Sequence, residues 1–236
     1  VRVSTLPIHY GENIVCRILD SQKAVIDFED LWFFWTSKRM LNRAVSKKAG
    51  MVLVTWPTGS GKTTTLYTIL NKLNSREKKI ITLEDPIEYE LEWVVQSEID
   101  DKNWVTFESG LKACLRQDPD IIMVWEIRDL ETLNTATAAS LTGHLVLSTL
   151  HTKSAADTLD RIINMGLKPY ILASALDTII AQRLVRRICP DCKVEKEKTP
   201  QDTWILEAMM KETGMQALST DHMKLYTWEW CSTCNH

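Results

Sequence analysis

The sequence predicts an α/β protein with a mostly parallel sheet that carries helices on both faces. Short apolar runs typical of buried strands alternate with segments of helical periodicity, the pattern of repeated strand–helix–strand units. A glycine-containing loop lies directly between one such strand and the helix after it. Polar side chains follow several strands at their carboxyl ends, where open α/β sheets bind ligands. Together these observations predict that ligands bind at the edge of the sheet formed by the carboxyl ends of its strands.

Residues 1–30 are predicted to be the end of a domain that begins before this sequence. Strands are expected at Arg2 to Thr5 and at Asn13 to Leu19, joined by the turn sequence LPIHYGE. A hairpin of this kind needs a sheet to join, because two strands alone are marginally stable in water. We therefore expect a further domain upstream.

Residues 31–183 are expected to form the sheet and its helices. The expected strands are apolar runs, each followed by a polar residue, at 51–55, 79–83, 121–125 and 144–150. The expected helices have apolar positions three and four residues apart, at 37–48, 61–74, 107–116, 130–141, 155–165 and 170–183. Such alternation suits a parallel sheet with crossover helices.

The stretch VTWPTGSGKTTT, Val54 to Thr65, predicts a phosphate-binding loop between a strand and a helix. Backbone N–H groups of such a loop wrap a phosphate, and the N-terminus of the following helix adds its positive dipole end. The lysine would reach the outer phosphates, and the hydroxyl after it would bind magnesium. The alternative is a glycine-rich turn that binds nothing. The expected contacts are Pro57, Thr58, Gly59, Ser60, Gly61, Lys62, Thr63 and Thr64, with Thr63 as the magnesium ligand.

Glu126 is the candidate catalytic carboxylate, because it closes the apolar run IIMVW. A carboxylate at that place can orient or deprotonate an attacking water, and Arg128 can offset charge on a transferring phosphoryl group. The alternative is a surface carboxylate with no catalytic part. The phosphate loop, which already defines the active edge of the sheet, favours catalysis.

An acidic cluster and two histidines flank other strands of the predicted sheet. Glu84, Asp85 and Glu88 suit water positioning and the coordination of metal-bound water, with a solvated acidic turn as the alternative. His144 and His151 bracket the run HLVLSTL, and either could sense phosphate or bridge to a neighbouring subunit. A lone histidine is more often structural.

Four of the six cysteines form the pairs CPDC and CSTC, a spacing that favours metal over a disulfide in a cytosolic protein. Four thiolates complete a tetrahedral zinc site and leave no open position, so structural zinc is favoured and a redox pair is the weaker alternative. The charged segment KVEKEKTPQDT between the pairs is predicted to be a loop. The other two cysteines, Cys16 and Cys114, are expected to be small buried residues. The predicted zinc element covers residues 184–236, is expected to continue beyond this sequence, and has the ligands Cys189, Cys192, Cys231 and Cys234.

Composition restricts the location and the partners that we expect. A net charge of -3 and a pI near 6.0 give no global basic field for nucleic acid or anionic lipid. No apolar run is long enough to span a bilayer, and no secretory signal pattern opens the sequence. We expect a cytoplasmic protein that does not bind nucleic acid directly and reaches a membrane only through protein partners.

The motifs, in their order along the chain, resemble those of the secretion ATPases. The stretches PTGSGKTTTLY, ITLEDPIEYE, LRQDPDIIMVWEIRD, LTGHLVLSTLHT and CPDC with CSTCNH look like the Walker A, Asp-box, Walker B, His-box and tetracysteine motifs of that family. The resemblance covers nearly the whole chain. These proteins are the hexameric motors of type II secretion and of type IV pilus extension.

The resemblance implies a RecA-like phosphate-loop core, ATP, Mg²⁺, and a ring of six subunits peripheral at the inner face of the cytoplasmic membrane. The ring would dock on an inner-membrane platform protein, and domain rotation on hydrolysis would move pilin subunits into a filament. Retraction ATPases generally lack the tetracysteine element, so extension or secretion is expected, with pilus extension favoured over type II secretion.

The same resemblance assigns roles to individual residues. Residues 1–30 would be the end of the family's second N-terminal, α+β domain, whose arginines reach nucleotide. Lys112 stands where the family often has arginine, which puts that contact in doubt. The residues carried over are Glu126, Glu84, Arg128, Arg2, Arg17 and His151 as catalytic, Asp85 and His144 as nucleotide-binding, and Arg116 and Arg161 as further arginines of the core.

Two other functions remain possible from the sequence. Tryptophans beside the phosphate loop and before Glu126 suit a catalytically impaired ring subunit that binds partners. A RecA-like motor on nucleic acid with a zinc ribbon is a third hypothesis, and the missing basic stripe counts against it.

The nine tryptophans against eight glycines are unusual in a phosphate-loop protein. Tryptophan and glycine have nearly opposite steric demands, so repeated exchange between them is not a natural substitution path. We hypothesise UGA codons that the source organism reads as glycine, as some bacterial lineages do. If the tryptophans are real, we expect poor folding or weak ATP binding, with the indole at 125 displacing Glu126 or filling the nucleotide site. The tryptophans at positions where the family usually has glycine are Trp32, Trp56, Trp93, Trp104, Trp125 and Trp230.

Overall fold

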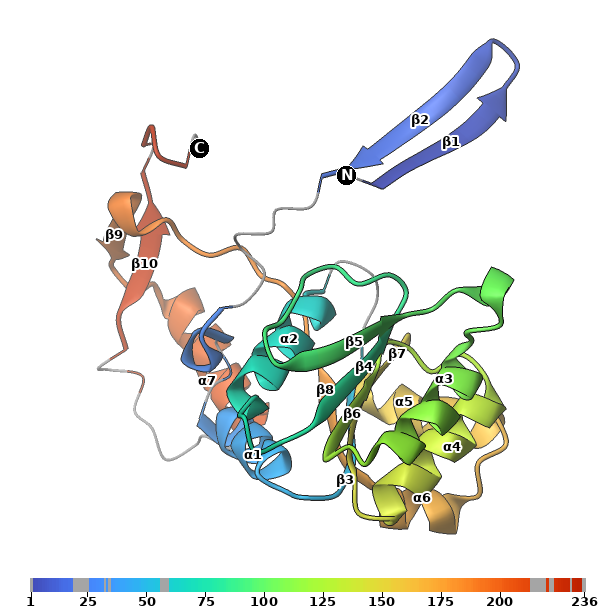
Figure 1. The fold of residues 1–236 in the computed structure, drawn as a ribbon. Coiled ribbons are helices and arrows are strands. Elements are labelled where there is room, and N and C mark those ends of the chain that lie inside the picture. The colour runs from blue at the N-terminus through green and yellow to red at the C-terminus, as the bar shows by residue number, and fades with distance from the viewer. Residues whose placement is uncertain are drawn as a thin grey trace. The chain divides into compact units, whose positions relative to one another are not determined.

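A parallel six-stranded sheet lies at the centre of the first of two units into which the computed structural model divides, Val1–Leu184 and Val185–His236. The structure describes residues 2–18, 26–31, 33, 35–55, 60–212, 220, 223–229 and 231–234. None of the helices described there combines the length and apolar character that crossing a membrane requires. Figure 1 shows the elements of each unit.

The sheet has the strand order β5-β4-β6-β7-β3-β8, and all neighbouring strands run parallel. The four inner strands are almost wholly buried, as expected for a parallel sheet covered on both faces. The predicted α/β fold is therefore confirmed. The strands are β3 (Gly50–Thr55), β4 (Ile80–Glu84), β5 (Val94–Glu98), β6 (Ile121–Val124), β7 (Leu145–Leu150) and β8 (Leu176–Ala181).

Helices form a layer on each face of the sheet (Figure 1). Successive residues of a strand face opposite sides. Accordingly, Met51 and Leu53 of β3 pack in one layer and Val52 packs in the other. The layer at Val52 contains α1 (Trp35–Val45) and α2 (Lys62–Leu73); the other contains α3 (Phe107–Cys114), α4 (Leu130–Leu141), α5 (Ala155–Asn164) and α6 (Pro169–Ala175). The described part of the first unit also has short 3-10 turns at Phe28–Leu31, Asp101–Asn103 and Leu115–Gln117.

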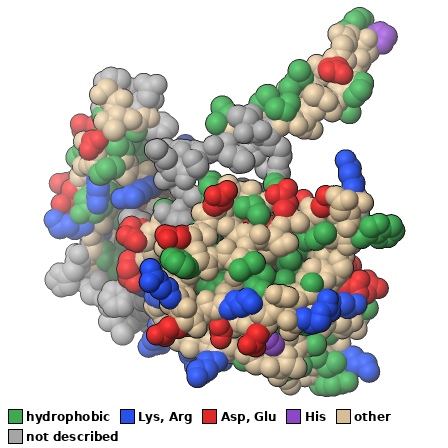
Figure 2. Space-filling view, viewed as in Figure 1, with side chains coloured by type: hydrophobic (Ala, Val, Ile, Leu, Met, Phe, Trp, Pro, Cys, Tyr) green, Lys and Arg blue, Asp and Glu red, His purple; other side chains and the backbone are tan. Residues whose placement is uncertain are grey.

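The N-terminal hairpin is longer than predicted. Strands β1 (Arg2–Ile8) and β2 (Gly11–Arg17) are antiparallel, and Pro7 pairs with Glu12, so the proline belongs to the strand and the turn is only His9 and Tyr10. Apolar side chains on the hairpin are exposed, as Figure 2 shows. A two-stranded hairpin cannot cover such side chains by itself.

The two cysteines outside the CxxC pairs differ from each other. Cys114 lies buried in α3, as predicted, and burial raises the pKa of its thiol. Cys16 lies in β2 and is exposed, so the prediction that it is buried is wrong. Cys16 follows apolar residues in the sequence of β2, but its side chain is exposed to solvent in the structure.

The two edge strands of the sheet differ from the prediction. Residues 170–183 were expected to be one helix, yet α6 ends at Ala175 and β8 follows and pairs with β3. The β-branched run Thr178, Ile179 and Ile180 suits a strand, and the free side of β3 supplies its hydrogen-bonding partners. Strand β5 was not predicted at all, because its sequence VVQSE is half exposed and lacks a continuous apolar run.

The second unit contains a small antiparallel pair, β9 (Lys193–Lys196) and β10 (Leu225–Trp228), together with α7 (Pro200–Glu212) and the 3-10 turn Pro190–Cys192. The predicted loop KVEKEKTPQDT is wrong, because β9 and the start of α7 lie within it. Thr199 and Asp202 exchange side-chain and backbone hydrogen bonds of 3.0 Å and 3.2 Å, with Pro200 between them. This capping box, with proline at the first helical position, is a sequence signature that could have predicted the start of α7.

Candidate functional site

Polar residues from four neighbouring strand ends meet at the carboxyl edge of the sheet. Lys62 begins α2 beyond β3, and Asp85 directly follows β4. Glu126 comes two residues after β6, and His151 directly follows β7. Parallel strands place their carboxyl ends at one edge, which is why residues far apart in sequence lie together here.

Hydrogen bonds and ion pairs join these residues into one continuous series, called here the polar chain: Lys62, His151, Glu126, Arg128 and Asp85. Lys62 Nζ lies 3.3 Å from His151 Nδ1, and His151 Nε2 lies 3.2 Å from Glu126 Oε1. Arg128 Nε donates to Glu126 Oε2 at 2.8 Å, and its Nη1 lies 3.2 Å from Asp85 Oδ2. Glu126 is thus the middle residue of the polar chain, and each of its carboxylate oxygens has one contact, with His151 or with Arg128.

The electrostatics of the polar chain follow from burial and these contacts. Burial lowers the pKa of Lys62, while the nearby charge of Glu126 opposes that shift. The hydrogen bond to Glu126 is the main cause that raises the pKa of Arg128. The Glu126 side chain is only 17% exposed, whereas Arg128 is 53% exposed. The half-buried ammonium of Lys62 would attract an added anion more strongly than an exposed ammonium would, and the charge of Glu126 would oppose that attraction.

Only the end of the predicted phosphate loop is described, from Ser60 onward. Gly61 has φ 82 and precedes the first residue of α2. The positive φ favours glycine at this position, and a Cβ at Gly61 would lie 3.2 Å from Leu184 Cδ2 and 3.3 Å from Gln182 Nε2, so these two side chains would have to shift to admit it. Ser60 Oγ is buried and has no hydrogen-bond partner within the described part of the chain. Thr63 and Thr64 lie half-buried in the first turn of α2, and the predicted contacts Pro57, Thr58 and Gly59 lie outside the described residues, as does Trp56.

Gln182 supports this loop and was missed by sequence reasoning. Its Nε2 donates to Ser60 O at 2.7 Å, and its Oε1 accepts from Thr65 Oγ1 at 2.8 Å. Gln182 directly follows β8, so it too lies at a strand's carboxyl end. Reading residues 176–181 as a strand would have revealed it.

Glu84 does not contact solvent in this structure. It is 0% exposed, and its carboxylate accepts hydrogen bonds from the side chains of Tyr67 and Thr82. Gln96 Nε2 donates to the same carboxylate at 2.9 Å. In this arrangement the buried carboxylate is engaged by these three side chains and is not open to water, so the expected water-positioning role of Glu84 stays a prediction. Glu88 lines a surface hollow of about 580 Å³ beside β5, together with Glu90 and Glu98.

His144 lies at the opposite edge of the sheet from the polar chain. It precedes the first residue of β7, and His151 follows the last, a separation of roughly 20 Å along a strand of this length. Its Nδ1 lies 3.0 Å from Ala139 O at the end of α4. The prediction that it binds nucleotide at this chain's own site is wrong; a bridge to a neighbouring subunit stays a prediction.

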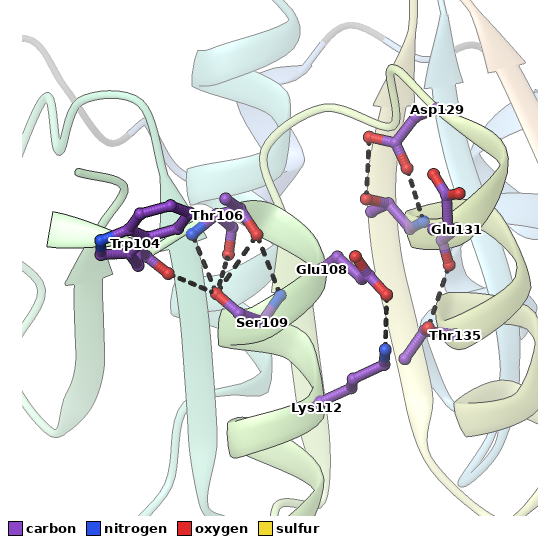
Figure 3. Close-up of polar contacts among 9 residues, drawn as sticks. Trp104, Thr106, Glu108, Ser109, Lys112, Asp129, Glu131 and Thr135 are labelled. Carbon is purple, nitrogen blue, oxygen red and sulfur yellow. Dashed lines mark hydrogen bonds and ion pairs between the residues drawn. The ribbon is translucent and has the colours of Figure 1, made fainter. Parts of the chain in front are cut away.

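The arginines named from the sequence fall in several places. Arg2 and Arg17 are paired across β1 and β2, and the structure describes their backbone but not their side chains. Arg116 lies exposed in the turn Leu115–Gln117, and Arg161 lies exposed in α5. Lys112 pairs with Glu108 one turn away on α3, as Figure 3 shows.

Trp125 packs beside the polar chain without entering it. Its ring lies 6.2 Å from that of Tyr67 in an edge-to-face arrangement, and it packs against the hydrophobic core. Glu126 keeps both of its partners beside this indole. The expected displacement of Glu126 is therefore not seen.

Four cysteines of the second unit form a candidate metal centre. The Sγ atoms of Cys189, Cys192, Cys231 and Cys234 all lie within 4.8 Å of one another. The separations from Cys189 to Cys231 and from Cys192 to Cys234 are 3.9 Å and 3.7 Å. A tetrahedron of zinc–sulfur bonds of about 2.3 Å has edges of about 3.8 Å, so the thiols are spaced for such an ion.

The comparison with known protein families decides which family this architecture represents. The family model described as "Type II/IV secretion system protein" matches residues 1–236. The chain belongs to this family. A curated relative of this secretion system protein, the type II secretion system protein E of Aeromonas hydrophila, is 46% identical over 236 residues, covering 100% of this chain and 45% of the relative.

Two further relatives of this secretion system protein come from pilus systems. The type IV pilus assembly ATPase PilB of Pseudomonas aeruginosa is 46% identical over 235 residues, covering 100% of this chain and 40% of that protein. The crystal structure of the pilus retraction motor PilT with bound ADP is 30% identical with a TM-score of 0.65, covering 92% of this chain and 70% of that chain. The resemblance to the secretion ATPases is confirmed, and the chain spans less than half the length of these curated relatives.

Proposed function

We propose that this chain is the motor part of an ATP-hydrolysing assembly ATPase that works as a homo-hexamer. The observation that carries the proposal is the polar chain, which links the phosphate-loop residue Lys62 to the carboxylate of Glu126. The family relatives that bear the name ATPase support it. In the proposed division, residues 1–30 end an N-terminal domain, residues 31–183 form the ATPase core, and residues 184–236 form the zinc element.

Lys62 and the start of α2 are proposed to hold the phosphates of ATP. The helix N-terminus offers donors to an anion, and so does the buried hydroxyl of Ser60, which has no hydrogen-bond partner among the described residues. Lys62, whose pKa burial lowers, gains a partner when a phosphate lies beside it. Mg²⁺, held by the hydroxyl of Thr63, would neutralise charge on the phosphates.

Glu126 is proposed to accept the proton of the attacking water, and Arg128 to balance charge on the phosphoryl group. His151 Nε2 and Arg128 Nε orient the two carboxylate oxygens. Asp85 in turn holds the guanidinium of Arg128 through its Oδ2. Each residue of the polar chain thus fixes the next, which is the preorganisation that catalysis by positioning requires.

The four-cysteine cluster is proposed to hold one structural Zn²⁺. The spacing of the thiols supports a closed site, because four thiolates leave no open position on zinc for a substrate. Zinc there would stabilise the small second unit, whose function in the motor is structural in this proposal.

The biological role is proposed to be type IV pilus extension or assembly of a type II secretion pseudopilus. The tetracysteine element favours these over retraction. The ring would be cytoplasmic, peripheral at the inner face of the cytoplasmic membrane, and docked on an inner-membrane platform protein and its pilin-assembly machinery. Arg2 and Arg17 would reach nucleotide from the N-terminal domain, and no direct nucleic-acid contact is proposed.

The test is Mg²⁺-dependent ATP turnover by the full-length protein assembled into its ring. Hydrolysis that depends on Glu126 is expected, with six subunits per ring by analytical ultracentrifugation. An intact ring that binds partners but does not hydrolyse ATP would instead support the second candidate, an impaired ring subunit. This second candidate is motivated by the tryptophan directly before Glu126 in the sequence, whereas Glu126 keeps its contacts with Arg128 and His151 in the structure.

A motor on nucleic acid is the weakest alternative. On the face shown in Figure 2, acidic and basic side chains are interspersed over the first unit. Sequence-independent nucleic-acid binding depends on basic contacts to phosphates and weakens steeply with salt. Salt-sensitive DNA binding by the assembled protein would revive this alternative.

A further inference from the structure

Two tryptophans of the first unit have backbone conformations that belong to glycine. Among the described residues, the non-glycine residues with positive φ are Trp93 at 64°, Trp104 at 63° and Asp118 at 52°. Aspartate enters this region readily because its short polar side chain can hydrogen-bond locally, whereas a bulky side chain there is an outlier. Both tryptophans therefore need an explanation.

Trp93 occupies the third position of a tight turn. Val94 N donates to Leu91 O at 3.3 Å, which makes residues 91–94 a β-turn. Of the two central residues, Trp93 has positive φ and Glu92 does not. A positive φ at the third residue is what a type II turn requires, and glycine is favoured at that position.

Trp104 closes a second turn of a kind that also uses glycine. Asp100 and Val105 form an antiparallel bridge with N–H···O distances of 3.0 Å in both directions, and Asn103 N donates to Asp100 O. A turn followed by one left-handed residue before the strand resumes places glycine at that last residue. The carbonyl oxygen of Trp104 accepts from Ser109 Oγ at 2.9 Å, which fixes the backbone there (Figure 3).

The side chains gain little that would offset the strained backbone. The indole of Trp104 is 86% exposed and that of Trp93 is 59% exposed. Trp93 does have one favourable contact, with the Arg76 guanidinium 4.8 Å from its ring centroid, and such exposed cation–π contacts are weak. Position 104 is therefore the clearer case.

We infer that residues 93 and 104 are glycine in the protein as its own ribosomes make it, encoded by UGA. At both positions the resemblance to the secretion ATPases implies glycine, and both have a positive φ. The other three tryptophans lie in regular secondary structure. Trp35 begins a helix, Trp204 lies within a helix, and Trp228 ends a strand. The eight glycines and the six tryptophans at family glycine positions make 14 of 236 residues, which is closer than eight to the roughly 7% share that glycine usually takes.

The same codon would also place glycine at the other four positions where the family usually has glycine, which are 32, 56, 125 and 230. Trp125 has no positive φ, so its backbone neither supports nor opposes the assignment. Trp32, Trp56 and Trp230 lie outside the described residues. Glycine at position 56 would complete the GxxxxGKT pattern of the phosphate loop.

The first test is the coding DNA. UGA codons are expected at positions 93 and 104, and UGG codons at 35, 204 and 228. A UGG codon at either 93 or 104 overturns the assignment at that position.

The second test is physical and independent of any activity. In the full chain, Trp104→Gly is expected to lower the equilibrium constant for unfolding by about twofold to tenfold, since strain relief exceeds the entropy that glycine adds to the unfolded state. Trp104→Ala removes the same indole but keeps a Cβ, so it should gain nothing. Trp204→Gly, at an exposed helical position, should raise the constant. Equal effects of the glycine and alanine substitutions at 104 would contradict the inference.

A separate observation, the set of hydrogen bonds around Glu84, carries a second inference. Besides Tyr67 and Thr82, its carboxylate binds Gln96, whose Nε2 also donates to Tyr89 O at 2.9 Å and whose Oε1 accepts from Leu91 N at 2.7 Å. Glu84 therefore joins α2, β4, β5 and the connection between β4 and β5. Burial and the contact with Glu84 both raise the pKa of Tyr67, which stays a neutral donor.

We propose that Glu84 is a positioning residue for Asp85 and, through it, for Arg128. Asp85 is the next residue in the chain, and its carboxylate holds Arg128 Nη1 at 3.2 Å. Fixing the β4–β5 connection from the interior fixes the direction in which Asp85 points. This inference rests on the proposed ATPase function.

Rescue by the conservative variant separates positioning from direct catalysis. Glutamine has nearly the same shape as glutamate. Its amide oxygen can still accept hydrogen bonds from Thr82 and Gln96, and its amide nitrogen can donate one to the hydroxyl oxygen of Tyr67. Glu84→Gln should thus retain at least tenfold more kcat than Glu84→Ala. Equal loss in both variants, with normal hydrolysis by the unsubstituted protein, would overturn the inference and leave the ATPase function standing.

Amide hydrogen exchange compares Glu84→Ala with Glu84→Gln without measuring ATP hydrolysis. The Leu91 amide, which Gln96 holds, should exchange faster in Glu84→Ala than in Glu84→Gln. If the unsubstituted protein proves inactive, this measurement still decides whether Glu84 organises the β4–β5 connection. Equal exchange in the two variants would show that it does not.

Discussion

Glu126 is the residue on which the candidate site depends most. It takes contacts from His151 on one oxygen and from Arg128 on the other, and it is the less exposed partner in each contact. A largely buried carboxylate held by two cationic or neutral donors keeps a defined orientation. Its role can therefore be tested by a change that preserves shape and removes only basicity.

Glu126→Gln is expected to lower ATP hydrolysis by about 10²–10⁴-fold, the usual contribution of a general base, while ATP binding persists. Steady-state turnover and binding of a fluorescent ATP analogue measure the two separately. Glu131→Gln, an exposed carboxylate in the first turn of α4, is the matched control and should leave both unchanged. Turnover by Glu126→Gln at the unsubstituted rate would remove Glu126 from the mechanism.

Single residues were predictable where a strand end could be located. Lys62, Glu126 and His151 follow continuous apolar runs, and the structure brings them together. Gln182 was missed because its strand was read as a helix. The surroundings of Glu84 could not be predicted, because whether a carboxylate after a strand turns inward depends on Tyr67 and Gln96, which come from other elements.

Helix α4 carries the segment after Glu126, and its start is fixed by a side-chain cap. Asp129 Oδ1 accepts from Thr132 N at 2.7 Å, and its other oxygen accepts from Thr132 Oγ1 at 3.1 Å (Figure 3). The carboxylate at the helix N-terminus also complements the dipole. Asp129 is therefore a structural part of the EIRD motif, directly after Arg128 and three residues after Glu126.

Asp129→Ala is expected to lower the free energy of unfolding by about 1 kcal/mol, the typical loss of an N-cap. Asp129→Ser keeps a capping oxygen and should lose much less. Urea unfolding followed by circular dichroism measures both. If the serine variant proved as unstable as the alanine variant, the cap would not be the source of the effect.

Elements were predictable from sequence in proportion to their burial. Inner strands such as β3 and β7 are apolar throughout because both faces are covered, and this is the signal that periodicity detects. The edge strands β5 and β8 are partly exposed and carry mixed residues. Their identity depends on the neighbouring strand that they join, which no local pattern contains.

The two units of the molecule have different sources of stability. The first unit has an extensive core on both faces of its sheet. In the described part of the second unit, only Cys192 and Met210 are buried. So small a core cannot offset the chain entropy of folding, so the second unit requires a cross-link such as a metal ion.

Removing zinc is therefore expected to unfold the second unit and spare the first. The full chain should contain one zinc per subunit by elemental mass spectrometry, and Cys192→Ser should lose it, because three thiolates hold the ion less tightly. Cys16→Ser, at an exposed cysteine in β2, is the matched control and should keep the metal. After treatment with a chelator, limited proteolysis should cut within residues 185–236 while residues 60–184 stay protected. A metal-free protein with an equally protected second unit would show that packing alone, or a disulfide detected by thiol titration, stabilises it.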